Sequence, residues 1–116
     1  MKGQSDYQFL SSLERKVWDW LAKNNISFDT ERTFLAEAGE LGSARVDFVI
    51  PDRNLLLRVM GSYWHSGLEA EARDRLGKEG LMAQGWIVVD LWEDDLTDEK
   101  IERTMRLAIE GREVIR

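Results

Sequence analysis

The first regular pattern along the chain is an amphipathic helix over residues 12–24. Its apolar positions recur at helical spacing, at Leu13, Val17, Trp20 and Leu21. Ser11 and Glu14, three residues apart, form the capping-box signature of a helix N-terminus. Residues 1–11 lack this periodicity, and we expect them to form a flexible N-terminal arm.

Two later segments, residues 45–50 and 55–60, have the pattern of β-strands. The first alternates, and its expected core face consists of Val46, Phe48 and Ile50. The second is apolar at every position except Arg58, which suits a central strand that is buried on both faces. The turn at 51–54 would join the two strands as an antiparallel hairpin. Residues 28–35 form a weaker candidate strand.

The second half of the chain alternates helix and strand. A helix is predicted from a capping box at Ser66 to the residue before Gly85, which would end it. A β-branched strand over 86–91 follows, so the strand–helix–strand order predicts a parallel, right-handed crossover. Thr97 is the expected cap of a last helix that ends near residue 111. The pattern therefore predicts an α/β domain with a mixed sheet and helices on its faces, in the order helix, strand, hairpin, helix, strand, helix.

Length and composition restrict the class of protein. A chain of 116 residues suits one domain, expected here over residues 12–116. The absence of cysteine excludes disulfides, cysteine nucleophiles and thiolate zinc sites. We expect no membrane association and a cytoplasmic location, because no apolar run reaches membrane-spanning length and the N-terminus lacks a signal-peptide pattern. We expect no nucleotide cofactor, because no glycine-rich phosphate-binding motif is present.

The net charge of −6 bears on the expected partners. A protein that coats nucleic acid without a metal normally carries a broad basic face, so the charge counts against that class. It does not exclude a metal-dependent nuclease, because a metal site needs carboxylates and the bound cation changes the local charge.

One acidic residue in the predicted hairpin is the main candidate for chemistry. Asp47 occupies a strand position, where carboxylates are disfavoured. Taken alone, it would be assigned to a solvated sheet face or to an ion pair with a neighbour such as Arg58. It is followed, however, by the turn, the apolar strand and the sequence Gly-Ser-Tyr-Trp-His at 61–65. Further on, residues 85–93 begin with Gly-Trp and end with Trp-Glu.

This order of motifs resembles the PD-(D/E)XK nucleases, and most closely the very-short-patch-repair (Vsr-like) endonucleases. The resemblance covers about residues 12–96. It implies a restriction-endonuclease-like fold and a DNA endonuclease that depends on Mg²⁺ or Mn²⁺. By position, Asp47 would be the metal ligand and His65 the general acid/base or phosphate-polarising group. Glu14 would orient a metal-bound water or a neighbouring base, although its place in the capping box explains this residue without a catalytic role. His65 has a structural alternative too, as a cap of the strand end.

Two positions depart from the family pattern. Arg58 and Met60 stand where the wider superfamily has a second acid and a lysine, and Vsr-like enzymes have a histidine where this chain has Met60. Arg58 would either pair with Asp47 and compete with the metal, or bind a phosphate directly. The cysteine-rich zinc site of the Vsr-like group is absent. The expected DNA contacts are Arg45, Arg53, Arg58, Tyr63 and Trp64.

Three hypotheses follow for function. The first is an active metal-dependent DNA endonuclease for repair or restriction. The second is a catalytically inactive nuclease-fold domain that binds DNA or a protein partner. The third is a structural or regulatory α/β module that only resembles nucleases. A homodimer is a further hypothesis that the sequence does not test.

Overall fold

The structure, a computed structural model, describes residues 4–30, 46–61 and 67–114. The strands are β1 (Asp29–Thr30), β2 (Phe48–Ile50), β3 (Leu55–Met60) and β4 (Ile87–Trp92). The α-helices are α1 (Ser12–Lys23), α3 (Leu68–Ala83) and α4 (Ile101–Ala108). Short 3-10 helices are η1 (Gln4–Phe9), η2 (Pro51–Arg53) and η4 (Glu93–Asp95).

The strands form one mixed sheet in the order β1-β2-β3-β4. β2 pairs antiparallel with β1 and with β3, and β3 pairs parallel with β4. The predicted hairpin and the predicted parallel crossover are therefore both confirmed. All six residues of β3 are buried, as expected for a central strand.

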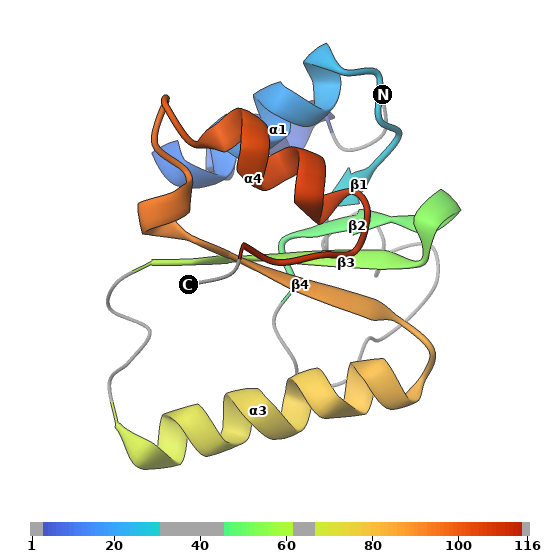
Figure 1. Cartoon of the computed structure of the whole chain (residues 1–116), viewed down its shortest axis with the longest axis vertical. Coiled ribbons are helices and arrows are strands. Elements are labelled where there is room, and N and C mark those ends of the chain that lie inside the picture. Colours follow the sequence, from blue (N-terminus) through green and yellow to red (C-terminus); the bar gives the residue numbers. More distant parts are fainter. Residues whose placement is uncertain (1–3, 31–45, 62–66, 115–116) are drawn as a thin grey trace.

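The sheet lies between two unequal helical layers (Figure 1). Helices α1 and α4 cover one face and α3 covers the other. The larger hydrophobic core lies on the α1–α4 face, where edge-to-face contacts link Trp18, Phe28 and Phe48. These rings lie with centroids 5.0 Å apart for Trp18 and Phe28 and 5.7 Å apart for Phe28 and Phe48.

Among the described residues, the core on the α3 face is small. Leu81 is the one described side chain of α3 that is fully buried. It packs with four residues of the sheet region, namely Val46, Val49, Leu56 and Val88. Because the described residues bury little apolar surface here, we expect polar contacts to contribute more to holding α3 on the sheet.

The helix predicted over residues 12–24 matches α1 closely. The capping box at α1 is confirmed: the Glu14 amide donates to Ser11 Oγ at 3.1 Å, and the Ser11 amide donates to Glu14 Oε1 at 2.9 Å. Residues 4–9, within the expected arm, form η1. Arg15 donates to the carbonyl groups of Tyr7 and Gln8, at 3.2 and 3.0 Å, and so ties η1 to α1.

The predicted caps of the later helices are wrong. The N-cap of α3 is Gly67, with a φ of 129° and no side-chain cap, and Ser66 lies outside the described residues. The N-cap of α4 is Lys100 rather than Thr97, again without a side-chain bond. The Thr97 carbonyl instead accepts from the amides of Lys100 and Ile101, so a turn precedes the helix. Gly85 ends α3 as predicted, with a φ of 99°.

The first strand of the hairpin is shorter than predicted and changes face. The Asp47 amide donates at 3.0 Å to the carbonyl of Leu57, which is also the register partner of Phe48. Asp47 and Phe48 are therefore both opposite Leu57, as in a β-bulge, and Asp47 lies just before β2. Val46 packs in the α3-side core, not beside Phe48, so the predicted alternation through Val46 is wrong. Of the predicted strand 28–35, β1 takes Asp29–Thr30, and residues 31–35 are outside the described ranges.

We predict that Leu57→Ala lowers the free energy of unfolding by about 2–5 kcal/mol, because it opens a cavity in a fully buried strand position. The matched control is Leu68→Ala, which removes the same atoms from a side chain that is 85% exposed. Urea unfolding followed by circular dichroism should give a change within about 0.5 kcal/mol for the control. Equal losses in the two variants would contradict the described burial.

Candidate functional site

A cleft opens at the carboxyl end of β3, with a volume of about 260 Å³. The residues that line it come from the start of α1, the end of β3 and the start of η4: Ser11, Ser12, Leu13, Glu14, Val59, Gly61 and Glu93. Two carboxylates, Glu14 and Glu93, therefore come from distant parts of the chain to one hollow. Glu93 directly follows β4, which pairs with β3 in parallel, so the two strands end at the same edge.

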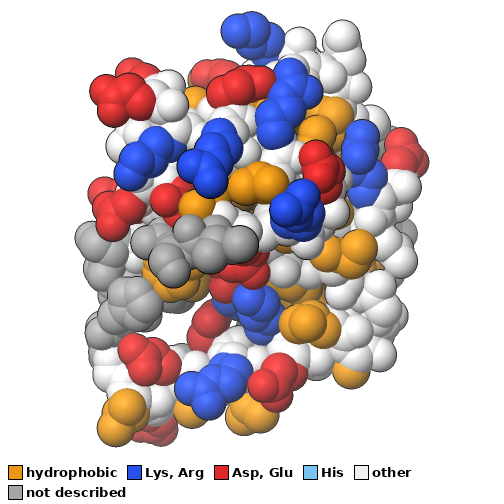
Figure 2. All heavy atoms as spheres, viewed as in Figure 1, with side chains coloured by type: hydrophobic (Ala, Val, Ile, Leu, Met, Phe, Trp, Pro, Cys, Tyr) orange, Lys and Arg blue, Asp and Glu red, His pale blue; other side chains and the backbone are white. Residues whose placement is uncertain are grey.

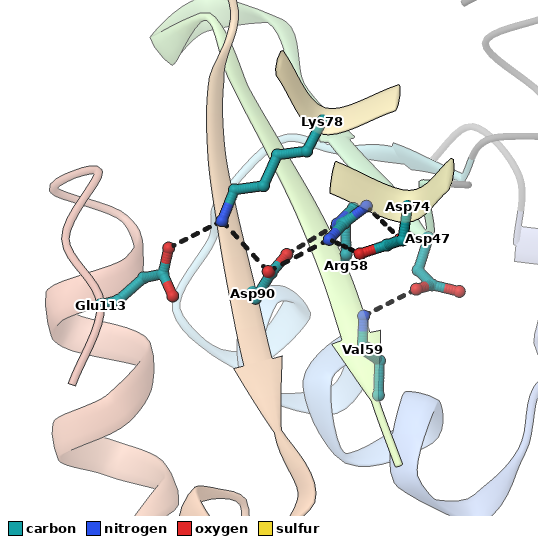
Figure 3. Close-up of polar contacts among 7 residues, drawn as sticks. All are labelled: Asp47, Arg58, Val59, Asp74, Lys78, Asp90 and Glu113. Carbon is teal, nitrogen blue, oxygen red and sulfur yellow. Dashed lines mark hydrogen bonds and ion pairs between the residues drawn. The ribbon is translucent and has the colours of Figure 1, made fainter. Parts of the chain in front are cut away.

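Asp47 is buried and does not itself line this cleft, but it is hydrogen-bonded to a residue that does. Its Oδ2 accepts a hydrogen bond of 2.7 Å from the backbone amide of Val59, one of the residues that line the cleft. The side chain reaches β3 because the bulge at Asp47 turns it toward that strand. The carboxylate of Asp47 and the wall of the cleft thus share a backbone contact (Figure 3).

Glu14 takes part in two structural features. It completes the capping box of α1, and it lines the cleft. The capping role is established by its hydrogen bonds, so the helix itself holds the carboxylate at the cleft wall. A role with a metal-bound water stays a prediction.

Arg58 is the largest fully buried side chain among the described residues and lies between the sheet and α3 (Figure 3). Its Nε donates to Asp90 Oδ1 at 2.6 Å, and one terminal nitrogen donates to Asp74 Oδ1 at 2.8 Å. The other terminal nitrogen donates to both carboxylates, at 2.9 Å to Asp74 Oδ2 and 3.1 Å to Asp90 Oδ2. All three guanidinium nitrogens thus bond to a carboxylate from α3 or β4, in the bidentate geometry that favours arginine over lysine.

Lys78 extends this network toward the C-terminal segment. Its Nζ lies 3.1 Å from Asp90 Oδ2 and 3.4 Å from Glu113 Oε2. Burial raises the pKa of Asp90, but hydrogen bonds and attraction from Arg58 and then Lys78 outweigh burial and leave that pKa below its ordinary value. Burial likewise lowers the pKa of Arg58, and the bonds to Asp90 and Asp74 outweigh it and raise the pKa. The pair therefore stays ionised at neutral pH.

Arg58 does not form an ion pair with Asp47. The ion pairs of Arg58 with described residues are those with Asp74 and Asp90. Asp90 is also the register partner of Arg58 on the adjacent parallel strand. Arg58 therefore neither competes for Asp47 through an ion pair nor presents its guanidinium to solvent, and a phosphate would have to displace two carboxylates to reach it.

The other predicted site residues divide between described and undescribed positions. Met60 is buried at the end of β3. Arg53 is exposed and donates to the carbonyl of Ile109 at 3.1 Å. Four predicted residues lie outside the described ranges: Arg45, Tyr63, Trp64 and His65. The sequence pattern did not single out Glu93 for the site or Asp90 for the network. A signal for both was the parallel pairing of β3 with β4, which fixes Arg58 opposite Asp90.

The described residues do not by themselves form a complete metal centre. Within 4–30, 46–61 and 67–114, no group of three or more His, Cys, Asp or Glu side chains is close enough to hold an ion. None of the helices in these ranges has the length and apolar character needed to cross a membrane. No family model, curated protein or solved structure matches the chain.

We predict that Arg58→Met lowers the free energy of unfolding by about 3–5 kcal/mol, because it leaves Asp74 without its cation and the largely buried Asp90 with Lys78 alone. Arg58→Met combined with Asp90→Leu should recover much of this loss, since the pair is then replaced by apolar groups. The matched control is Arg106→Met, which breaks an exposed pair with Glu102 and should cost about 1 kcal/mol or less. Urea unfolding measures all three. A loss for Arg58→Met no larger than the control would contradict the described network.

The lowered pKa of Asp90 gives a prediction for pH. A carboxyl group whose pKa is lower in the folded state stabilises the fold above its unfolded pKa of about 3.9. This contribution is lost as the pH falls through the folded value. The difference in unfolding free energy between the native chain and Asp90→Asn should therefore shrink as the pH is lowered from about 5 to below 3.9. The matched control is Asp98→Asn, at a side chain that is 96% exposed, which should change the free energy of unfolding by no more than about 0.5 kcal/mol.

Proposed function

We propose that this chain is a metal-dependent DNA endonuclease with a PD-(D/E)XK-like site at the carboxyl end of β3. The Asp47 carboxylate is the proposed metal ligand, and the cleft bounded by Glu14 and Glu93 is the proposed site of the scissile phosphate. The hypothesis comes from the order of motifs around Asp47. The geometry of the hairpin adds support that the motifs alone do not provide.

One observation carries the proposal. The guanidinium of Arg58 is hydrogen-bonded to Asp74 and Asp90. The carboxylate of Asp47 instead accepts a hydrogen bond from the backbone amide of Val59, which lines the cleft. The main objection from the sequence was that Arg58 would pair with Asp47. With Arg58 satisfied elsewhere, that competition for the carboxylate is removed.

The donor chemistry fits Mg²⁺ or Mn²⁺. Both are hard cations that prefer carboxylate oxygens, and Mg²⁺ needs one or two protein carboxylates because it keeps waters and takes phosphate oxygens. Asp47 supplies such an oxygen next to the cleft. The bound ion would stabilise charge on the scissile phosphate and lower the pKa of a water nucleophile.

The residues of the chain have distinct proposed parts. Asp47 holds the ion and keeps its position through the amide of Val59. Glu14, fixed by the capping box, orients a water on the cleft wall. His65 follows Gly61 by four residues in the sequence and lies outside the described ranges; by the resemblance, it would polarise the phosphate or transfer a proton. Exposed Arg53 and the predicted contacts Arg45, Tyr63 and Trp64 would bind DNA.

A second candidate is a catalytically inactive nuclease-fold domain that binds DNA or a protein. Two observations favour it. Met60 is apolar and buried where the nucleases that the sequence resembles have a lysine or histidine, and Arg58 is held in a structural network where that superfamily has an acid. In this chain, the first of these positions packs in the interior and the second holds α3 on the sheet through ion pairs.

The deciding experiment is nicking of supercoiled plasmid with Mg²⁺ or Mn²⁺, with and without a chelator. We expect metal-dependent nicked product from the native chain and none from Asp47→Asn. Asparagine keeps an oxygen acceptor for the Val59 amide and loses only the charge, so the fold should be retained. The control variant Asp52→Asn, at an exposed position in η2, should nick at the native rate.

Each result separates the candidates. Nicking that persists in Asp47→Asn would rule out this carboxylate as the metal ligand. Metal-independent binding of DNA without product, measured by mobility shift, would favour the inactive domain. Urea unfolding of each variant shows whether lost activity reflects lost structure.

A further inference from the structure

Three large apolar side chains of α3 are exposed on the side of the helix that faces away from the sheet. Leu68, Leu76 and Met82 are 85%, 67% and 53% exposed, and together with Phe9 and Ile87 they are the exposed large hydrophobic residues among those described. Figure 2, in which α3 lies along the lower edge, shows hydrophobic side chains at the surface there, with acidic and basic side chains between them. We call the surface formed by Leu68, Ala72, Arg75, Leu76, Glu79 and Met82 the α3 outer face.

These residues form one continuous stripe. Steps of three and four residues along a helix return to the same side, so Leu68, Ala72 and Leu76 follow one another, with Glu79 and Met82 next in line. The inward side of α3 is used differently, because Asp74 and Lys78 bind the Arg58–Asp90 network and Leu81 packs on the sheet. The outer face therefore makes no contribution to the monomer core.

We propose that the α3 outer face is a homodimer interface, in which α3 of one copy packs antiparallel against α3 of the other. The two-fold axis passes beside Leu76. The two Leu76 side chains then meet each other, and Leu68 of each copy meets Met82 of its partner. This inference does not depend on the proposed nuclease function.

The charges on this face favour a second copy of the chain as the partner and an antiparallel arrangement of the two helices. The side chains of Arg75 and Glu79 are exposed, and neither forms a side-chain hydrogen bond or an ion pair with another described residue. In the antiparallel arrangement, Arg75 of each copy lies beside Glu79 of the other, giving two complementary pairs. A parallel arrangement would place each charge beside its own copy, which is repulsive. The face is thus complementary to itself only when the second helix is reversed.

The dimer is expected to be weak. α3 has 16 residues and is about 24 Å long, so a single pair of helices covers less surface than a standard stable interface of roughly 800 Å² per partner. We therefore expect dissociation constants in the micromolar to millimolar range and a monomer in dilute solution.

Cysteine cross-linking tests the arrangement directly, because the chain has no cysteine of its own. Leu76→Cys should form an intermolecular disulfide under mild oxidation, since the two-fold axis brings the two thiols together. Leu68→Cys is the matched control: its two copies would lie about 20 Å apart, because each faces residue 82 of the partner. We expect the Leu76→Cys disulfide to form at least about tenfold faster than the Leu68→Cys disulfide, and the double variant Leu68→Cys with Met82→Cys to cross-link as readily as Leu76→Cys.

Sedimentation equilibrium with charge variants gives an independent readout. Glu79→Arg should weaken the dimer several-fold, and Arg75→Glu combined with Glu79→Arg should restore it. A native chain that stays monomeric up to millimolar concentration would overturn the proposal. Equal cross-linking of Leu68→Cys and Leu76→Cys would overturn the antiparallel arrangement, and a dimer unchanged by Glu79→Arg would overturn the assignment to this face.

Discussion

The buried guanidinium of Arg58 is the interaction on which the arrangement of this domain depends. It lies in the central strand and bonds to one carboxylate from β4 and one from α3. A buried charge is costly unless its hydrogen bonds are satisfied, and here all three nitrogens have acceptors. Since Leu81 is the one fully buried side chain described on α3, these ion pairs largely determine how that helix sits on the sheet.

The same interaction separates the acidic residues into two groups with different consequences. Asp74 and Asp90 balance Arg58 and Lys78 and are held within the fold. Asp47, Glu14 and Glu93 lie at or beside the cleft at the end of β3. A chain with a net charge of −6 can thus concentrate negative charge at one candidate site without leaving its interior uncompensated.

The two faces of the sheet carry different proposed roles. The cleft is lined by the start of α1, which lies on the face opposite α3. Association through the α3 outer face would therefore leave both clefts of a dimer open. Polar anchoring of α3 on its inner side and apolar residues on its outer side are consistent with each other, because a helix that is held by ion pairs needs few of its leucines for the monomer core.

The sequence by itself determined the features that depend on neighbouring residues. The capping box at Ser11 and Glu14, the apolar run of β3 and the glycine that ends α3 could all be predicted, because their physical causes lie within a few residues. The partners of Arg58 could not, since Asp74 and Asp90 lie 16 and 32 positions away and meet it only through the crossover and the strand order. The same holds for the bulge that turns Asp47 toward Val59 and moves Val46 to the other face, because pairing with β3 sets that register. Local spacing specifies which elements form, whereas the assembled sheet decides which charges meet, because electrostatic and backbone pairing depend on distance in space.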